Sequence, residues 1–172
     1  MARLPYADPT DPALVALASR IASERGGKML NLYKMLLHSP PLADGWRQLL
    51  TAIRQQGLLA ARYRELAILR IAVLNQADYE FAQHQPFALH EGYTLPQLDQ
   101  LKTPDYRLYF DNIDVLVIEY TDAMTTSIRV PQALFAALRA HFGAREMVEL
   151  TATVAAYNMV SRFLEALELD HE

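Results

Sequence analysis

The stretch RYRELAILRIAVLNQADYEFAQHQPFALHEGYTLPQL, residues 62–98, decides the fold predicted for this chain. Residues 62–75 carry apolar side chains on nearly every face, which is typical of a helix buried at the centre of a protein. A second helix is expected to begin near Asp78, a residue favoured as an N-cap, and to end at Gly92. Thr94 then opens a capping-box pattern for a short third helix. We therefore expect three consecutive helices, the first of them at the core.

The rest of the chain also has a helical pattern. Alternation typical of strands is absent, and the helix-favouring residues Ala, Leu, Arg, Gln and Glu dominate. Trp46 is expected to anchor its helix in the core, and residues 103–110 form the clearest interruption. Further helices are expected over residues 12–25, 29–37, 40–56, 112–126, 131–142 and 145–169. The sequence predicts an all-α bundle of roughly eight to nine helices in a single domain, residues 1–172.

Composition narrows the classes of partner. Hydrophobic residues make up 52% of the chain and charged residues 21%, with a net charge of −4, which is ordinary for a soluble domain. No basic stripe is present, so nucleic acid is not an expected partner. The N-terminus lacks the apolar core of a signal peptide, and no apolar run reaches the roughly 18 residues of a membrane span. We expect a cytoplasmic protein that does not bind membranes.

The chain contains no cysteine. This absence removes disulfides, thiolate metal sites, cysteine nucleophiles and thiol redox chemistry together. No zinc-binding spacing such as His-Glu-x-x-His occurs either, so neither a metal nor another cofactor is expected.

Three ionisable residues in the 62–98 stretch are candidates for acid/base chemistry. Glu65 shares a helix face with apolar residues, so it either points toward the core or simply favours the positive end of the helix dipole. Glu80 and His84 are four residues apart and can form a hydrogen bond that orients the imidazole, or an ordinary surface pair. Pro86 removes a backbone donor next to His84 and predicts a kink there.

Residues 62–98 resemble the core segment of the carboxymuconolactone decarboxylase/alkylhydroperoxidase D-like superfamily, with weaker similarity around Trp46 and in ELTATVAAYNMVSRFLEALEL at the end of the chain. The resemblance implies an all-α fold of the alkylhydroperoxidase D-like type and a homo-oligomer, a trimer or a hexamer. The peroxidase branch uses a Glu, a Cys-x-x-Cys pair and a His four residues after the second Cys. In this sequence the Glu corresponds to Glu65 and the His to His84, while the cysteines are replaced by Ala77 and Glu80.

The replaced cysteines imply that the protein is not a thiol peroxidase. The decarboxylase branch works without the cysteine pair, so the resemblance implies a lyase that decarboxylates a small lactone acid. His84 or Glu80 would supply the proton, and Glu65 would complete a relay. A cationic group should hold the substrate carboxylate, and a phenol could orient the substrate. The candidate substrate-binding residues are Arg62, Arg70, Arg162, Tyr79 and Tyr33.

A non-catalytic alternative is also open. The chain could be an oligomeric binding or interaction protein that keeps the fold and uses Glu80 and His84 as a structural ion pair. A ligand-sized cavity lined by Glu65, Glu80 and His84 would favour an enzyme acting on a small-molecule substrate. A closed, fully hydrogen-bonded cluster would favour the alternative.

Overall fold

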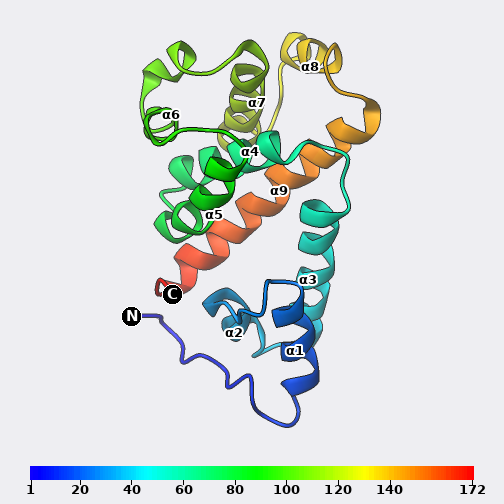
Figure 1. Cartoon of the computed structure of the whole chain (residues 1–172), viewed down its shortest axis with the longest axis vertical. Helices are drawn as coiled ribbons and strands as arrows, with labels where there is room; N and C mark the ends of the chain where they lie inside the picture. The colour runs from blue at the N-terminus through cyan, green and yellow to red at the C-terminus, as the bar shows by residue number, and fades with distance from the viewer. The chain divides into compact units, whose positions relative to one another are not determined.

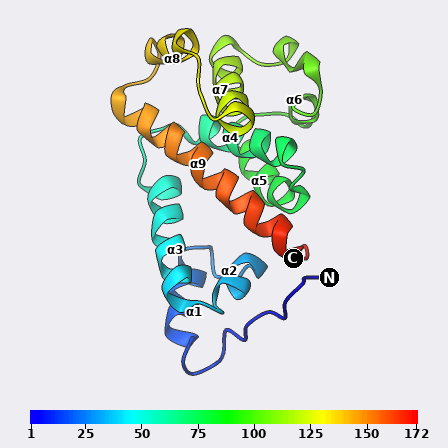
Figure 2. The ribbon, with the colours of Figure 1, turned by 180° about the vertical axis from the view of Figure 1, so that it is seen from behind.

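A computed structural model describes residues 1–172 and is helical throughout, with nine α-helices, one 3₁₀-helix and one π-helix (Figures 1 and 2). The predicted all-α class is confirmed. The chain divides into two compact units: unit 1 consists of Met1–Gln56 and Leu164–Glu172, and unit 2 of Gly57–Phe163. The assignment of residues 1–172 to one domain stays a prediction.

Unit 1 is built from α1 (Val15–Ser23), α2 (Asn31–Leu36) and α3 (Pro40–Gln55). Proline is favoured at the start of α3 because the first helical N–H groups have no intrahelical partner. The fully buried side chains of this unit include Ile21, Tyr33, Leu36 and Leu37. Trp46 is buried on α3, so its prediction as a core anchor is confirmed.

Polar contacts join segments of unit 1 at two places, near the two chain ends and between α1 and α3. Near the chain ends, Arg3 forms an ion pair with Glu168 at 2.6 Å, and the Glu172 carboxylate accepts a hydrogen bond from the backbone N–H of Asn31 at 2.7 Å. Between α1 and α3, Glu24 follows the last residue of α1 and binds Arg47 at 2.5 Å. The two termini of the chain are thus fixed within the same unit.

Unit 2 has α4 (Ala61–Leu74) at its centre. Five of its apolar side chains have no exposed surface: Leu66, Ala67, Ile68, Leu69 and Ile71. Helices α5 (Asp78–His90) and α7 (Asn112–Asp122) both pack against it. The prediction that α4 is a central buried helix is confirmed, and its burial follows from apolar residues on nearly every face of the helix.

Helix α5 begins one residue earlier than predicted. Asp78 is its first helical residue and Ala77 is the N-cap, so the prediction of Asp78 as the N-cap is wrong. The reason is the bond from the Phe81 N–H to the Ala77 carbonyl, which extends the helix to Asp78. In the first turn the Asp78 carboxylate still lies at the positive end of the helix dipole. The helix continues through Pro86.

The remaining elements of unit 2 follow the predicted order. Thr94 and Gln97 form both bonds of the capping box at the start of α6 (Leu95–Gln100), as predicted. The predicted interruption contains the 3₁₀-helix η1 (Pro104–Leu108). Helix α8 spans Gln132–Arg139, and α9 spans Ala144–Leu167, with its last residues belonging to unit 1.

The helix predicted over residues 112–126 is divided. Helix α7 ends at Asp122, and the π-helix η2 (Ala123–Ser127) continues it. The Arg129 N–H then bonds the Ser127 carbonyl at 2.7 Å, which closes a γ-turn around Ile128 at φ 65°. Positive φ is costly for a β-branched residue, so the turn is strained.

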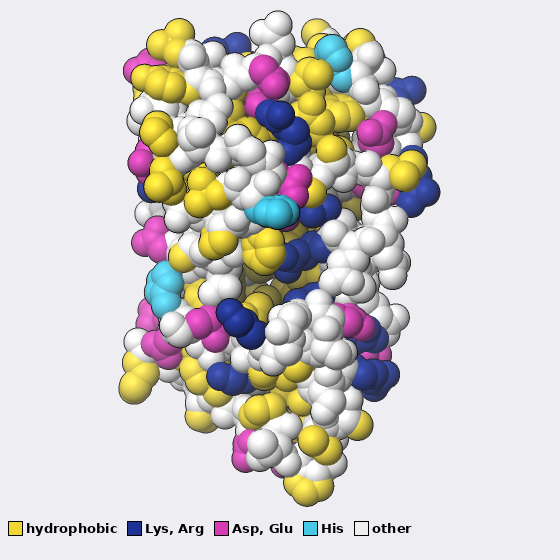
Figure 3. Space-filling view, in the orientation of Figure 1, with side chains coloured by type: hydrophobic (Ala, Val, Ile, Leu, Met, Phe, Trp, Pro, Cys, Tyr) yellow, Lys and Arg dark blue, Asp and Glu magenta, His cyan; other side chains and the backbone are white.

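On the face shown in Figure 3, acidic and basic side chains are scattered among hydrophobic and neutral ones. No helix of the structure is both long enough and apolar enough to cross a membrane.

Candidate functional site

Glu65 is a buried carboxylate within the apolar helix α4. Its residue is only 1% exposed, and a charge taken out of water is costly unless it is paired. Its two carboxylate oxygens are paired: Oε2 lies 2.6 Å from Nδ1 of His84, and Oε1 accepts a hydrogen bond from Nε of Arg64 at 3.2 Å. Of the two predicted orientations of Glu65, the structure confirms the one toward the core.

His84 comes from α5, the helix that packs beside α4 (Figure 1). His84 is 7% exposed. The Tyr157 ring from α9 packs edge-on against the imidazole, with 5.0 Å between the two ring centroids. The ring of Phe87, about one turn further along α5, lies beside the same imidazole, with 5.9 Å between the two ring centroids. The imidazole is therefore oriented by packing on two sides and by Glu65 at Nδ1.

The bond at Nδ1 determines which tautomer the ring adopts. A carboxylate accepts hydrogen bonds, so it holds the proton of a neutral imidazole on Nδ1 and leaves Nε2 as the basic nitrogen. If the ring gains a proton at Nε2, the negative charge of Glu65 stabilises the resulting imidazolium. The Glu65–His84 pair thus has a nitrogen that can accept a proton and a carboxylate that stabilises the charged ring, as a proton carrier requires.

Glu80 and Tyr79 lie in the first turns of α5. Glu80 is 2% exposed and Tyr79 5%, so neither is an ordinary surface side chain. Because residues four apart share a helix face, Glu80 lies on the same side of α5 as His84. Three predicted catalytic residues, Glu65, Glu80 and His84, are thus all buried on two adjacent helices.

Arg62 and Arg70 each bind a carboxylate of the protein. Arg62 bonds Asp114 at 2.6 Å and lies over the Tyr93 ring, whose hydroxyl donates to the same carboxylate. Arg70 bonds both carboxylate oxygens of Asp122, at 2.6 and 2.8 Å. These two residues connect α4 to α7.

Burial governs the electrostatics of the Arg62 cluster. It raises the pKa of Asp114 above its ordinary value, although the Tyr93 hydroxyl and Arg62 act in the opposite direction. Burial and the charge of Asp114 together raise the pKa of Tyr93 well above its usual range. Tyr93 therefore stays a neutral donor.

Arg162 and Tyr33 have other surroundings. Arg162, exposed on α9, donates to the backbone and side-chain oxygens of Asn158 at 2.8 and 2.5 Å, and no carboxylate pairs with it. Tyr33 belongs to unit 1, where its hydroxyl accepts a hydrogen bond from Arg25 at 2.9 Å. The structure does not group Tyr33 with the residues of unit 2.

Three residues around the pair are absent from the predicted set: Arg64, Phe87 and Tyr157. Arg64 contacts Glu65 although adjacent helix residues point in different directions, so spacing gives no signal for this contact. Tyr157 reaches His84 from a helix more than 70 positions later in the chain. In the sequence, Tyr157 is marked only as a polar residue inside the apolar run of α9.

The comparisons with known proteins agree with this architecture. Residues 40–102 match the model of the carboxymuconolactone decarboxylase family. No curated protein matches the chain.

Solved structures share the fold over nearly the whole chain. An uncharacterized peroxidase-related protein from Silicibacter sp. TM1040 matches with a TM-score of 0.84 and 18% identity, covering 99% of this chain and 92% of that one. The alkylhydroperoxidase AhpD core protein from Ralstonia eutropha JMP134, also peroxidase-related, matches with a TM-score of 0.84, 19% identity and the same coverage, 99% and 92%. The debrominase Bmp8, solved in complex with a tribromopyrrole, matches with a TM-score of 0.76 and 15% identity over 99% of this chain and 90% of that one. Residues 40–102 are therefore similar to the carboxymuconolactone decarboxylase family, and the chain as a whole shares the fold of the peroxidase-related, alkylhydroperoxidase AhpD-like structures.

Proposed function

We propose that unit 2 performs acid/base chemistry on a small carboxylated or lactone substrate, with His84 as the proton carrier and Glu65 as its partner. The observation that carries the proposal is the 2.6 Å bond between two side chains that are almost completely buried. General acid/base catalysis by a positioned imidazole contributes about 10²- to 10⁴-fold in rate. The absence of cysteine directs the chemistry away from thiols and toward proton transfer.

The reaction that fits these groups is the decarboxylation of a β,γ-unsaturated lactone acid. The bond between the ring carbon and the carboxylate breaks, its electron pair enters the conjugated system of the lactone, and CO₂ leaves. The resulting dienolate carbon takes a proton from the His84 imidazolium, and water restores that proton. Glu65 stabilises the imidazolium before the transfer and holds the ring in one orientation afterwards.

Among the predicted cations, Arg162 is the residue best suited to hold the substrate carboxylate. Arg62 and Arg70 would have to leave Asp114 and Asp122 to do so. Arg162 would instead exchange two bonds to the neutral Asn158 for a charged pair. A bidentate guanidinium–carboxylate contact is the stronger of the two arrangements.

The test is decarboxylation of γ-carboxymuconolactone by the wild type, His84→Gln and Glu65→Gln. We expect His84→Gln to lower kcat/KM about 100-fold or more, because the carrier is lost. Glu65→Gln should lower it about tenfold or more, because the imidazolium loses its stabilising charge. Glu91→Gln, a change just after α5, is the matched control and should leave the rate unchanged. A His84→Gln variant as fast as the wild type would overturn the proposal.

A second function is favoured by the closure of the same cluster. Both oxygens of Glu65 are bonded and the surrounding residues are nearly sealed from solvent. A structural ion pair in a non-catalytic homo-oligomer, a trimer or a hexamer, would have these features. Under this function Glu65→Gln and His84→Gln would lower stability or assembly, measured by thermal unfolding and analytical ultracentrifugation, and no lactone acid would be converted by any variant.

A further inference from the structure

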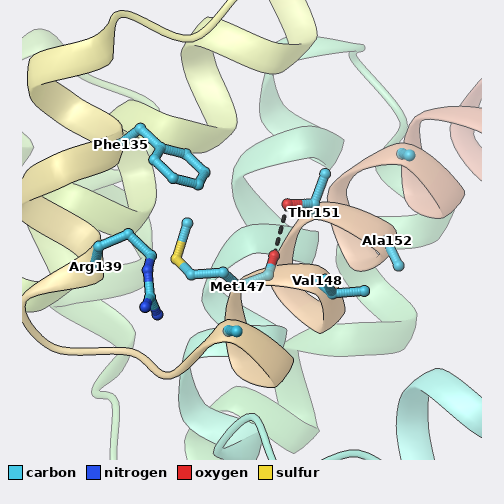
Figure 4. Close-up of a pocket in the computed structure, with 8 residues that line it drawn as sticks. Phe135, Arg139, Met147, Val148, Thr151 and Ala152 are labelled. Atoms are coloured by element: carbon cyan, nitrogen blue, oxygen red, sulfur yellow. Dashed lines mark hydrogen bonds between the residues drawn. The ribbon is translucent and has the colours of Figure 1, made fainter.

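An apolar groove lies between α8 and the first half of α9, entirely within unit 2 (Figure 4). Its volume is about 530 Å³, within the range of pockets that bind small molecules. The lining side chains are Phe135 and Arg139 of α8 and Ala144, Met147, Val148, Thr151, Ala152 and Ala155 of α9. None of these residues belongs to the Glu65–His84 site.

The sequence of α9 explains why space remains here. Ala144, Val148, Ala152 and Ala155 follow one another at spacings of three or four residues, so they form one stripe along the helix. Their side chains are too short to fill the gap opposite the Phe135 ring. Val148 is 67% exposed and Phe135 37%, so the groove presents apolar surface to solvent.

The two polar side chains of the groove differ in how far the fold satisfies their hydrogen bonding. The Thr151 hydroxyl donates to the Met147 carbonyl at 2.6 Å, the dashed bond in Figure 4, and lies 2.7 Å from the Tyr120 hydroxyl. It is therefore satisfied within the fold. Arg139 has one guanidinium bond, from Nη1 to the Phe142 carbonyl at 2.5 Å, and no carboxylate pairs with it. In Figure 4 Arg139 lies at one end of the labelled side chains and Ala152 at the other.

We propose that the groove between α8 and α9 binds an amphipathic carboxylate, with its apolar chain along the α9 stripe and its carboxylate on Arg139. Two observations support this occupant. The apolar lining favours a hydrocarbon body, and the single cation at one end lacks an anion that a ligand would supply. The proposal is independent of the chemistry at His84.

The experiment uses the full-length chain labelled with ¹³C at the methionine methyl groups, titrated with decanoate below its micelle concentration. The Met147 methyl signal, assigned with Met147→Leu, should shift saturably. Arg139→Gln should weaken decanoate binding about tenfold or more, because a charge-assisted hydrogen bond is lost. Arg129→Gln, at an exposed arginine outside the groove, should leave it unchanged. Uncharged decanol should bind weakly and equally to the wild type and Arg139→Gln.

A second variant closes the groove directly. Val148→Trp should abolish the decanoate shift, and it should leave the fold intact because Val148 is exposed, as a thermal unfolding curve would confirm. A Met147 methyl that ignores decanoate, or equal affinity of Arg139→Gln and the wild type, would overturn the proposal. So would an oligomer that dissociates in Val148→Trp during analytical ultracentrifugation, because the groove would then be an interface between copies.

Discussion

The burial of Glu65 requires its carboxylate to have partners. A carboxylate that is 1% exposed must be paired, and the structure pairs it with His84 at 2.6 Å and with Arg64 at 3.2 Å. A buried ion pair is costly to form but more costly to break, because the remaining charge is left without compensation. The stability of unit 2 should therefore depend on the pair whether or not it is catalytic.

The first prediction concerns this coupling. Glu65→Ala should lower the free energy of unfolding by about 3 to 5 kcal/mol, because a buried imidazole and Arg64 lose their partner. In a double-mutant cycle with His84→Ala, the two changes should be non-additive by about 1 to 3 kcal/mol. Urea unfolding measures all four species, with Glu91→Ala, at the residue that follows α5, as the control. Additive effects would mean that the two side chains do not interact.

The second prediction concerns Asp114. Burial raises its pKa above 3.8, so the native state binds this proton more tightly than the unfolded chain. Stability should then fall as pH rises from about 3.8 through the folded pKa. Tyr93→Phe removes a donor to the carboxylate, so the pKa should rise further and this decline should extend to higher pH. A carboxyl ¹³C titration of Asp114 measures the shift.

At neutral pH, Tyr93→Phe should also cost about 1 to 2 kcal/mol of unfolding free energy, because a buried carboxylate loses a hydrogen bond. The control is Tyr109→Phe, at an exposed tyrosine just after η1, which should change neither quantity. An Asp114 pKa that falls in Tyr93→Phe would contradict the cluster described for Arg62, Tyr93 and Asp114.

The third prediction concerns the strained turn after η2. Ile128 has φ 65° and is 85% exposed, so its side chain gains little packing in return for the strain. Ile128→Gly should stabilise the protein by about 1 kcal/mol, since the relief of strain exceeds the extra entropy of glycine in the unfolded chain. Ile128→Ala keeps the Cβ and should change little. Equal effects of Gly and Ala in thermal unfolding would show that the backbone is not strained.

Single residues of the site were predictable to different degrees. The helix face of Glu65 gave burial as one of two alternatives, and its pairing with His84, on another helix, was indicated only by the resemblance. Arg64 and Tyr157 could not be found from spacing, because one is a sequence neighbour and the other comes from distant α9. Tertiary contacts of this kind are decided by packing between helices rather than by local pattern.

At the scale of elements, local rules predicted most of the helices. The capping box of α6 and the largely apolar faces of α4 follow directly from residue type and spacing. The rules failed at two helix ends. Helix α5 gained one residue over the predicted Asp78 cap, and the helix after α7 changed from α to π hydrogen bonding at Ala123.

The fourth prediction tests the contact between α1 and α3. The Thr51 hydroxyl, followed by Arg47, lowers the pKa of Glu24 below 4.5. A depressed pKa contributes stability that is present above about pH 4.5 and is lost as pH falls through the folded pKa. Thr51→Val should raise the pKa of Glu24 and cost about 1 kcal/mol of unfolding free energy at neutral pH. The difference in unfolding free energy between Thr51→Val and the wild type should become smaller as the pH falls below about 4.5.

Urea unfolding across this pH range measures the effect of Thr51→Val. In a Glu24→Gln background the same change should show no such pH dependence, because the titrating group is absent. A pH-dependent cost that persists without Glu24 would assign the effect to another group.

At the scale of the whole molecule, the chain has two compact units, and the proposed chemistry lies in the second. The all-α class was predictable from composition and periodicity, whereas the division into units depends on long-range contacts that periodicity does not encode. The family model covers residues 40–102, and the solved structures extend the same fold over the rest of the chain. This fold hosts more than one chemistry, so the site itself must decide the function.

His84 is proposed to be a proton carrier that a carboxylated substrate can reach. The most direct measurement is a long-range ¹H–¹⁵N spectrum of the imidazole, assigned with His84→Gln, before and after addition of γ-carboxymuconolactone. We predict a proton on Nδ1, held by Glu65, and a saturable shift of the Nε2 signal with the lactone acid that is weaker with its uncharged methyl ester. An Nε2 signal that does not respond to the lactone acid at any concentration would contradict a catalytic role for His84 and leave Glu65 and His84 as a structural pair.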